Sequence, residues 1–464
     1  MTVGESEWSR RSILGGVAAS MAATAGCLGS AAQQTPAAGD WPQRGYDSGA
    51  TFYKEAGSPP VEDAGVAWDA EVDNSLYAVI DHRWHDDWRW NHYRDLTYQR
   101  HIGTLAYRYA RTPIVVVGEQ AYLSGKGSTV VDTTDGTAVE HSRPDERVLV
   151  GAARTDAYRD GMLVGTGVGD GADCRDRCVV IRGFQPSTED RAWFAGPRRW
   201  TAGAPKDFPA TAVAGRIEDG TIVTVVPDSE PPFRIVEIDA DDGRIEWENT
   251  ISHGVHRLRV ENGLAYASVL SEESGTMTIL DGSSVRQRVA IESTDLLEAV
   301  RDGVAYLRDF RTEAAAPSIK AVDAESGEVR RLLDGSTVAE RITGSPTGVG
   351  DLVVGPDRLF ASVHTETGSD PAVLALDRSD GTIEWVRQLP GRLRLTGTDD
   401  ALYVAGPREP GPQAYAFDPV SGDRLWSVEL PSRPSFGLGA YRPVVADSKV
   451  LVPLDGVLVA LEEP

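Results

Sequence analysis

Short runs of apolar or alternating apolar and polar residues, separated by turn residues, recur along most of the chain. One clear group reads RLRLTG, ALYVAG, QAYAFD and RLWSVEL, at residues 392–397, 401–406, 413–418 and 424–430. Runs of this length, bounded by Gly, Pro, Asp and Ser, are typical of β-strands. Four in succession predict one unit of four antiparallel strands.

The junction between the third and fourth strands of this unit carries a repeated motif. In ALDRSDGTIEWVRQLP, residues 375–390, an Asp is followed four residues later by Gly and four residues after that by Trp. The Asp can accept bonds from backbone N–H groups, and Gly adopts the left-handed conformation that closes such a turn. The Trp offers a large apolar face that can wedge between neighbouring units. Complete copies are Asp239, Gly243 and Trp247; Asp377, Gly381 and Trp385; and Asp418, Gly422 and Trp426.

The spacing of this motif predicts the architecture. With weaker copies included, the Asp place falls at residues 132, 182, 239, 281, 323, 377, 418 and 462, where residue 182 is Arg and residue 462 is Glu. A period of about 42 residues with insertions is typical of four-stranded propeller blades. One blade cannot cover its own apolar face, so blades stack radially and close. We therefore predict an all-β fold, an eight-bladed β-propeller of four-stranded antiparallel blades over residues 41–464.

The two ends of this repeat region complement each other. The last unit offers three strands, at residues 444–446, 449–453 and 457–462. GVAWDAEV, residues 65–72, looks like a fourth strand with its Trp68 and has no unit before it. We predict that this N-terminal strand completes blade eight and closes the ring.

The first 27 residues have the pattern of an export signal. Arg10 and Arg11 precede residues 13–25, which contain no charge and are fewer than the roughly 20 that a membrane-spanning helix needs. A basic start followed by a short apolar run predicts a signal peptide, and the arginine pair indicates the twin-arginine route. The run ends in Thr-Ala-Gly and Cys27, which resembles a lipobox, so we expect a lipid on Cys27; plain secretion is the alternative.

Residues 28–40 are small, polar residues typical of a flexible tether. With the signal and the lipid, they predict a protein anchored to the outer face of the cytoplasmic membrane. Besides Cys27, the chain contains Cys174 and Cys178. Outside the cell these two could form a disulfide, whereas a metal site would need more ligands than two thiols.

The charge balance limits the partners. A net charge of −24 argues against DNA or RNA, because phosphate binding needs a basic surface. Only five of the 46 basic residues are lysines. An acidic, lysine-poor chain resembles proteins of halophilic archaea, in which molar salt screens repulsion to a Debye length of roughly 3 Å. A merely acidic secreted protein is the alternative.

The motif and its period resemble the PQQ-like repeat of quinoprotein alcohol dehydrogenases and of the bacterial propeller lipoprotein that assists outer-membrane assembly. The segment WPQRGYDSGATFYKEAG, residues 41–57, is similar to the start of many such chains. The resemblance implies the propeller fold, but a propeller hosts many functions.

The dehydrogenases of this family hold PQQ between a Trp and a disulfide of adjacent cysteines, and they bind Ca²⁺ through acidic and amide side chains. Here Cys174 and Cys178 are not adjacent, and no acidic cluster matches the family's ligands. We therefore expect no catalytic residue, no firm metal site and neither PQQ nor Ca²⁺ as a cofactor. A PQQ- or metal-dependent oxidoreductase is the alternative.

Residues 75–111 form an insertion where the resemblance implies a short link. It contains His82, Trp84, His85, Trp88, Trp90, His92 and His101. Aromatic residues beside Arg and Asp are typical of recognition surfaces, and His with Asp could hold a transition metal. The insertion could also pack over the central channel as a lid.

The long connections between second and third strands are expected on the same face as this insertion. Loops on a rigid scaffold are where binding usually occurs. We therefore expect a non-catalytic scaffold at the cell surface that binds an envelope protein or polymer through this face.

Overall fold

The computed structural model divides the chain into two units, residues 1–35 and 36–464. The structure describes residues 40–41, 43, 46–47, 49–55, 57–72, 114–124, 128–141, 146–153, 162–169, 178–184, 191–195, 216–218, 220–226, 233–252, 255–270, 274–309, 317–366, 370–391, 393–406, 411–431, 442–454 and 456–464. Arg10, Arg11, Cys27, the tether up to residue 39, the insertion at residues 75–111 and Cys174 lie outside them. What the sequence predicts for those residues stays a prediction.

Eight β-sheets make up the described part of residues 36–464. Blade one contains β3 (Ile114–Val117), β4 (Gln120–Ser124), β5 (Ser128–Asp132) and β6 (Ala138–His141). Blade two contains β7 (Glu146–Ala153), β8 (Met162–Gly169), β9 (Cys178–Phe184) and β10 (Arg191–Ala195). Blade three contains β11 (Arg216–Glu218), β12 (Thr221–Val226), β13 (Phe233–Asp239) and β14 (Ile245–Ile251). Blade four contains β15 (Val255–Glu261), β16 (Leu264–Leu270), β17 (Gly275–Asp281) and β18 (Ser284–Ile291).

The second half repeats this plan. Blade five contains β19 (Asp295–Arg301), β20 (Val304–Asp309), β21 (Ile319–Asp323) and β22 (Val329–Leu333), and α5 (Gly335–Ala339) follows it. Blade six contains β23 (Pro346–Val354), β24 (Arg358–Thr365), β25 (Ala372–Asp377) and β26 (Ile383–Gln388). Blade seven contains β27 (Arg394–Thr398), β28 (Leu402–Gly406), β29 (Gln413–Phe417) and β30 (Arg424–Glu429), with β1 (Tyr53–Lys54) added parallel to β27. Blade eight contains β31 (Val444–Ala446), β32 (Lys449–Leu454), β33 (Val457–Glu462) and β2 (Gly65–Glu71).

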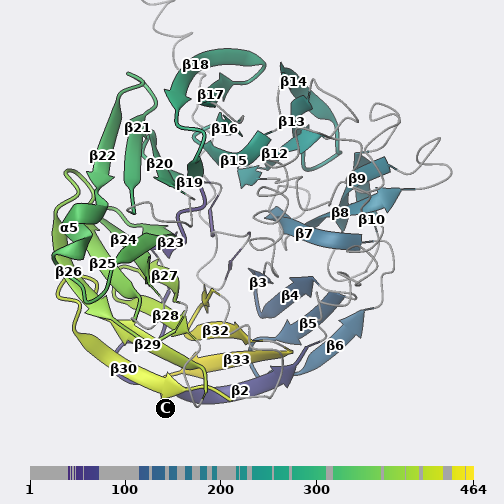
Figure 1. Cartoon of the computed structure of the whole chain (residues 1–464). Helices are drawn as coiled ribbons and strands as arrows, with labels where there is room; N and C mark the ends of the chain where they lie inside the picture. Colours follow the sequence, from purple (N-terminus) through teal and green to yellow (C-terminus); the bar gives the residue numbers. More distant parts are fainter. Residues whose placement is uncertain are drawn as a thin grey trace, which may run out of the picture. The chain divides into compact units, whose positions relative to one another are not determined.

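The predicted eight-bladed propeller is confirmed for the described residues. Within residues 36–464, Figure 1 shows the sheets around a common axis, with strands such as β3, β7, β15 and β19 near the centre and β6, β18 and β22 at the outside. The N-terminal strand β2 pairs antiparallel with β33, with Gly65 opposite Glu462 and Glu71 opposite Val457. This strand closes the ring because it gives blade eight its fourth strand.

The turns between third and fourth strands form for the reason that their sequence indicates. In blade six, the Asp377 carboxylate accepts from the Ser379 backbone N–H at 2.7 Å. Gly381 N–H donates to the Asp377 carbonyl at 2.9 Å, and its positive φ of 80° allows that closure. The side-chain and backbone bonds from Ser379 hold the pKa of Asp377 below its usual value. The same Gly-to-Asp backbone bond closes the turns at Asp132, Asp239, Asp323 and Asp418.

The Trp side chains of the fourth strands lie between blades. Trp385 in β26 is buried, and its indole N–H donates to the Pro419 carbonyl of blade seven at 3.1 Å. Trp426 in β30 is also buried, and it donates to the Pro60 carbonyl at 3.1 Å. Each indole thus joins the apolar core of one blade to the backbone of the next segment around the ring.

One repeat position was predicted wrongly. Arg182 was expected in the Asp place of blade two, at the start of the turn. In the structure, β9 continues to Phe184, and Arg182 pairs with Gly165 in mid-strand. The third strand of this blade therefore extends two residues past the place that the spacing indicated.

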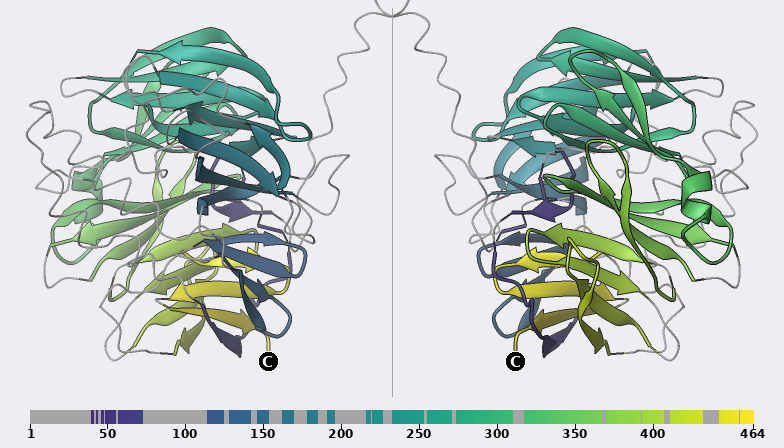
Figure 2. Two further views of the ribbon diagram at one scale, coloured as in Figure 1. Left: turned by 90° about the vertical axis from the view of Figure 1, so that its right-hand side faces the viewer. Right: turned by 90° about the vertical axis from the view of Figure 1, so that its left-hand side faces the viewer.

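A segment before β2, here called the N-terminal thread (residues 40–60), runs along the first strands. Trp41 exchanges two backbone bonds with Val116, both 2.9 Å long. Further along, backbone N–H groups of the blades donate to the thread: Val300 to Gly49, Val354 to Thr51, and Gly397 to Phe52. Figure 2 shows residues 36–464 from two sides, with the thread in purple between the blades. The thread therefore ties blades one, five, six and seven together through backbone hydrogen bonds.

Candidate functional site

The strand directions give the ring two different edges. Each first strand starts at one edge, and the antiparallel order returns the second and fourth strands to that edge. The connections between second and third strands and the crossovers between blades therefore leave from this side, called the loop edge. Its longer crossovers are residues 72–113, 196–215, 334–345 and 430–443. The opposite side, called the turn edge, carries the Asp–Gly turns and one longer connection, residues 154–161.

The insertion at residues 75–111 belongs to the crossover between β2 and β3. Its two supporting strands place its roots at the loop edge. His82, Trp84, His85, Trp88, Trp90, His92 and His101 lie outside the described residues, so no contact of theirs is known. Cys178 is the first residue of β9, which starts at the same edge, whereas Cys174 lies outside the described part.

The N-terminal thread bonds to the first strands near their ends, which lie at the turn edge. Val354 is the last residue of β23, and Val300 is the penultimate residue of β19. Both donate backbone bonds to the thread at 2.9 Å. The backbone of the N-terminal thread therefore runs across the ends of these first strands at the turn edge.

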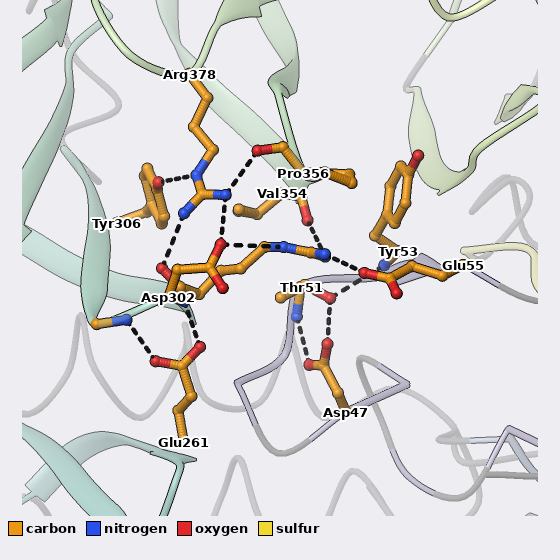
Figure 3. Close-up of polar contacts among 12 residues, drawn as sticks. Asp47, Thr51, Tyr53, Glu55, Glu261, Asp302, Tyr306, Val354, Pro356 and Arg378 are labelled. Carbon is orange, nitrogen blue, oxygen red and sulfur yellow. Dashed lines mark hydrogen bonds and ion pairs between the residues drawn. The ribbon is translucent and has the colours of Figure 1, made fainter. Parts of the chain in front are cut away.

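A polar network fixes the thread to blades five and six there (Figure 3). Arg301 forms an ion pair with Glu55 of the thread and donates to the Val354 carbonyl at 3.3 Å. The Asp47 carboxylate accepts two bonds from Thr51 within the thread, one of them from the Thr51 backbone N–H at 2.8 Å. This network holds one edge of blades five and six to a segment far away in sequence.

Arg378 extends this network across blade six (Figure 3). Its guanidinium donates to the Tyr306 hydroxyl at 2.6 Å, to Asp302 at 2.7 Å and to the Pro356 carbonyl at 2.7 Å. Two backbone N–H groups of the turn at Asp302 and Gly303 donate to Glu261 of blade four. These contacts join three blades, and all three guanidinium nitrogens of Arg378 donate to protein acceptors, so the network has a structural role.

A second charged group lies along the inner strands, towards the loop edge. We call it the axial arginine cluster, and it consists of Arg216, Arg257, Arg259, Arg308, Arg394 and Arg442. Arg216 and Arg394 are the first residues of β11 and β27, and Arg442 lies two residues before β31. Five blades therefore supply guanidinium groups to the centre of the ring.

Asp351 is the carboxylate that two of these arginines share. It lies where the register of β23 shifts, between Val349 and Leu352. Arg394 contacts one carboxylate oxygen at 2.9 Å and Arg442 the other at 2.9 Å. Burial alone would raise the pKa of Asp351, but the charges of Arg442 and Arg394 outweigh it and hold that pKa well below the usual range.

Glu298 has a similar position in β19. The register shifts around it, between Leu297 and Ala299, and Arg308 donates to its carboxylate at 2.7 Å. Burial opposes the ionised form, yet the charges of Arg308 and Arg257 lower the pKa of Glu298 below its usual value. Asp351 and Glu298 therefore stay ionised and are held by guanidinium groups.

Arg394 and Arg442 keep donors that Asp351 does not use. Arg394 contacts Asp351 through Nη1 only, and its side chain is 23% exposed. Arg442 uses Nε and Nη2 for Asp351, is 19% exposed, and leaves Nη1 without a hydrogen-bond partner among the described residues. Its guanidinium carbon lies 3.3 Å from the ring centre of Phe52 in the thread. The pair can therefore donate hydrogen bonds to a further anion, but it cannot act as a base.

The sequence motifs and this cluster serve different purposes. The repeat residues all lie at the ends of third strands, in turns or in fourth strands, away from the first strands: Asp239, Gly243, Trp247, Asp377, Gly381, Trp385, Asp418, Gly422, Trp426 and Trp68. The axial arginines were missed because no fixed spacing marks them. A usable signal was their recurrence near the start of first strands, as at Arg257 and Arg394.

Comparisons with known proteins agree with this fold. Residues 315–463 match the family described as outer membrane protein assembly factor BamB, which is less than half of the chain. No curated protein sequence matches the chain significantly.

Solved structures match over more of the chain. Quinohemoprotein alcohol dehydrogenase from Comamonas testosteroni gives a TM-score of 0.55 at 10% identity, over 93% of this chain and 82% of that one. The computationally designed protein Ika8 gives 0.51 at 10% identity, over 75% and 95%. BamB from Moraxella catarrhalis gives 0.47 at 11% identity, over 75% and 96%. At these identities the likeness concerns the fold alone, and the first two structures, with TM-scores above 0.5, support the fold described above.

The described residues fit a quinone with Ca²⁺ poorly. Asp351 and Glu298 already contact guanidinium groups, so neither offers a ligand for a cation. Within the described ranges, no group of three or more His, Cys, Asp or Glu side chains could hold a metal ion. The expectation that no cofactor binds remains a prediction.

In the described part of the chain, no helix is long and apolar enough to cross a membrane.

Proposed function

We propose that this protein is a non-catalytic scaffold that binds a protein or polymer of the cell envelope through its loop edge. The observation that carries the proposal is the strand order. It brings the crossovers and the connections between second and third strands to one side of a closed ring. Loops held by a rigid scaffold are common binding surfaces.

The charge of the inner residues supports a binding role over a catalytic one. General acid–base catalysis needs a group whose pKa lies near the working pH. Asp351 and Glu298 instead have lowered pKa values, because the neighbouring arginines stabilise their ionised forms. Burial raises the pKa of Asp47 to about 6, but this carboxylate accepts two bonds from Thr51 within the N-terminal thread. The match of residues 315–463 to an assembly-factor family is consistent with a protein partner.

The residues before the propeller supply the proposed location. A twin-arginine signal with Arg10 and Arg11, followed by a lipid on Cys27, would hold the ring at the outer face of the cytoplasmic membrane. Mass spectrometry of the purified native protein tests this directly. A mature chain that starts at Cys27 and carries a lipid supports the anchor, whereas a different first residue without a lipid rejects it.

Deleting the insertion tests the binding face. Residues 75–111 are replaced by a short Gly-Ser link, and each variant is used to capture partners from envelope extracts in molar salt. We expect the deletion to lose the captured species that the full chain retains, as identified by mass spectrometry. A charge reversal at the turn edge, Glu325→Arg, serves as the matched control because Glu325 is exposed there.

Circular dichroism must first show that the deletion variant folds and melts like the full chain. Unchanged capture by this folded variant would place the contact surface elsewhere.

For the alternative oxidoreductase function, the protein is incubated with PQQ and Ca²⁺ and then desalted. Retention of the quinone chromophore in stoichiometric amount would contradict the proposed scaffold role.

A further inference from the structure

We propose that the axial arginine cluster is a binding site for a small polyvalent oxyanion, a molecule bearing carboxylate or phosphate groups. Arg394 and Arg442 are its central donors. The site goes beyond the proposed scaffold function and does not depend on it. Arg394 lies on the first strand of blade seven, and Arg442 lies at the end of the crossover that leads into blade eight.

The geometry of the two donors carries the inference. Both guanidinium groups are already oriented, because Asp351 holds each of them at 2.9 Å. A guanidinium fixed in this way loses little rotamer entropy when it forms further hydrogen bonds. Arg394 has two nitrogen atoms that do not contact Asp351, and Arg442 has one. Guanidinium forks suit carboxylate and phosphate oxygens better than any neutral acceptor.

The surroundings favour an anion. The described cluster contains six arginines, and the carboxylates that contact Arg308, Arg394 and Arg442 are those of Glu298 and Asp351. Glu218 and Asp295 also lie on first strands, where Glu218 accepts bonds from backbone N–H groups and Asp295 pairs with Lys320. The lowered pKa values of Glu298 and Asp351 report the resulting positive potential. The chain as a whole carries a net charge of −24, so this potential is a local feature and not a consequence of composition.

The thread and the strand directions indicate how the site is reached. Phe52 of the thread lies against Arg442 on one side, and the thread crosses the first strands at the turn edge. Arg394 starts β27 and Arg442 precedes β31, so both lie towards the loop edge. The side chains of Arg394 and Arg442 are 23% and 19% exposed, while Arg442 Nη1 itself is buried without a hydrogen-bond partner.

High salt would not abolish such binding. At molar ionic strength, screening acts beyond roughly 3 Å, so the repulsion between the acidic surface and an anion is largely removed. Direct hydrogen bonds from oriented guanidinium groups act at shorter range and persist. Multivalent anions should therefore bind better than chloride or acetate, because they can contact both arginines at once.

Isothermal titration calorimetry of the full-length protein tests this inference. Citrate, inorganic phosphate and acetate are titrated separately, each into protein in molar sodium chloride. We expect saturable binding of one citrate or one phosphate per chain, and no saturable binding of acetate. The affinities for citrate and phosphate then decide between a carboxylate and a phosphate ligand.

The variants locate the site. Arg394→Gln leaves Asp351 paired with Arg442, so the variant should fold. Its affinity for the anion should fall by about tenfold or more, because one charge-assisted contact is lost. Arg394→Lys keeps the positive charge but loses the forked guanidinium geometry. Its affinity for the anion should lie between those of the parent chain and Arg394→Gln. Arg244→Gln, at an exposed ion pair, should bind like the parent chain.

Absence of saturable binding by both citrate and phosphate would overturn the inference. Equal affinity in the parent chain and Arg394→Gln would overturn it as well. Because the titration uses purified protein without any partner, its failure leaves the envelope-capture result untouched.

Discussion

The Trp68 indole of β2 donates its N–H to the Thr133 carbonyl of blade one at 3.2 Å, which joins the last blade to the first. Gly136, in the turn of blade one, lies so close that a Cβ atom there would be 2.8 Å from the same indole. The contact has the form of the other blade junctions, such as Trp385 with Pro419. It differs in that its donor, Trp68, comes from the N-terminal strand that completes the ring.

Replacing Trp68 should weaken the closure. Trp68→Ala removes both the hydrogen bond and the apolar contact with blade one, and we expect it to lower the free energy of unfolding by about 2–4 kcal/mol. Denaturant unfolding in molar salt measures this change. Val420→Ala, at a side chain that is 59% exposed, should change stability very little. A loss for Trp68→Ala no larger than that of the control would contradict the role of Trp68.

The turn glycines differ in what surrounds them. Gly422 and Gly263 have similar φ values, 70° and 73°. A Cβ atom on Gly422 would lie 2.5 Å from Trp385, whereas one on Gly263 would meet nothing within 4 Å. Both alanine variants bear the cost of the left-handed backbone, so Gly422→Ala should be less stable than Gly263→Ala by a further 1–3 kcal/mol, roughly the cost of overpacking. Equal unfolding midpoints would show that Trp385 does not pack on this turn.

Asp351 should be sensitive to loss of its charge. Asp351→Asn leaves Arg394 and Arg442 without their shared carboxylate, and breaking such a buried pair costs about 3–5 kcal/mol. Asp423→Asn is the matched control, because Asp423 is 80% exposed and contacts Arg387 at 3.3 Å. That control should lose less than about 1 kcal/mol. Thermal or denaturant unfolding measures the stability of each variant relative to the parent chain. Equal losses of stability in Asp351→Asn and Asp423→Asn would contradict the role given to Asp351.

Asp47 should give the fold a specific pH dependence. Burial raises its pKa to about 6, although bonds from Thr51 and the charge of Arg301 act in the opposite direction. A raised pKa means that the folded chain binds this proton more tightly than the unfolded chain. The stabilising effect is therefore full below the usual value of 3.8 and is lost as the pH rises through about 6.

Asp47→Asn is neutral at every pH and tests this sign. The melting temperature of the variant, relative to that of the parent chain, should rise between pH 4 and pH 7. The corresponding change in free energy should be on the order of 2 kcal/mol. Thr51→Ser, which keeps the backbone donor and the hydroxyl, should show the pH profile of the parent. A constant difference between Asp47→Asn and the parent across this range would contradict the raised pKa.

The repeat could be predicted from sequence because its chemistry is local. Asp377, Gly381 and Trp385 lie within nine residues, and the same turn recurs in other blades. The pairing of β2 with β33 joins the two ends of the described propeller, yet the pattern predicted it because one unit lacked a strand. Arg182 was misplaced because an average spacing does not fix the length of an individual strand.

The thread and the axial cluster depend on contacts without local signals. Gln43 exchanges two hydrogen bonds with Ile217, which lies 174 residues further along the chain. Arg442 and Asp351 are 91 residues apart and meet only because first strands of different blades converge on one axis. A sequence shows that such residues are present, but only the closed ring shows which of them face one another.

A designed disulfide between β2 and β33 tests ring closure most directly. Gly65 and Glu462 are partners in this pairing; Gly65 has open space for a Cβ atom, and the Glu462 side chain is 42% exposed. In a chain whose own three cysteines are changed to serine, Gly65→Cys with Glu462→Cys should form a bond under mild oxidation, seen as a linked peptide pair by mass spectrometry. The pair Gly65→Cys with Val420→Cys should stay unlinked. If the first pair stays reduced, or the second links equally well, then β2 does not complete blade eight and the eight-bladed ring is not closed in this way.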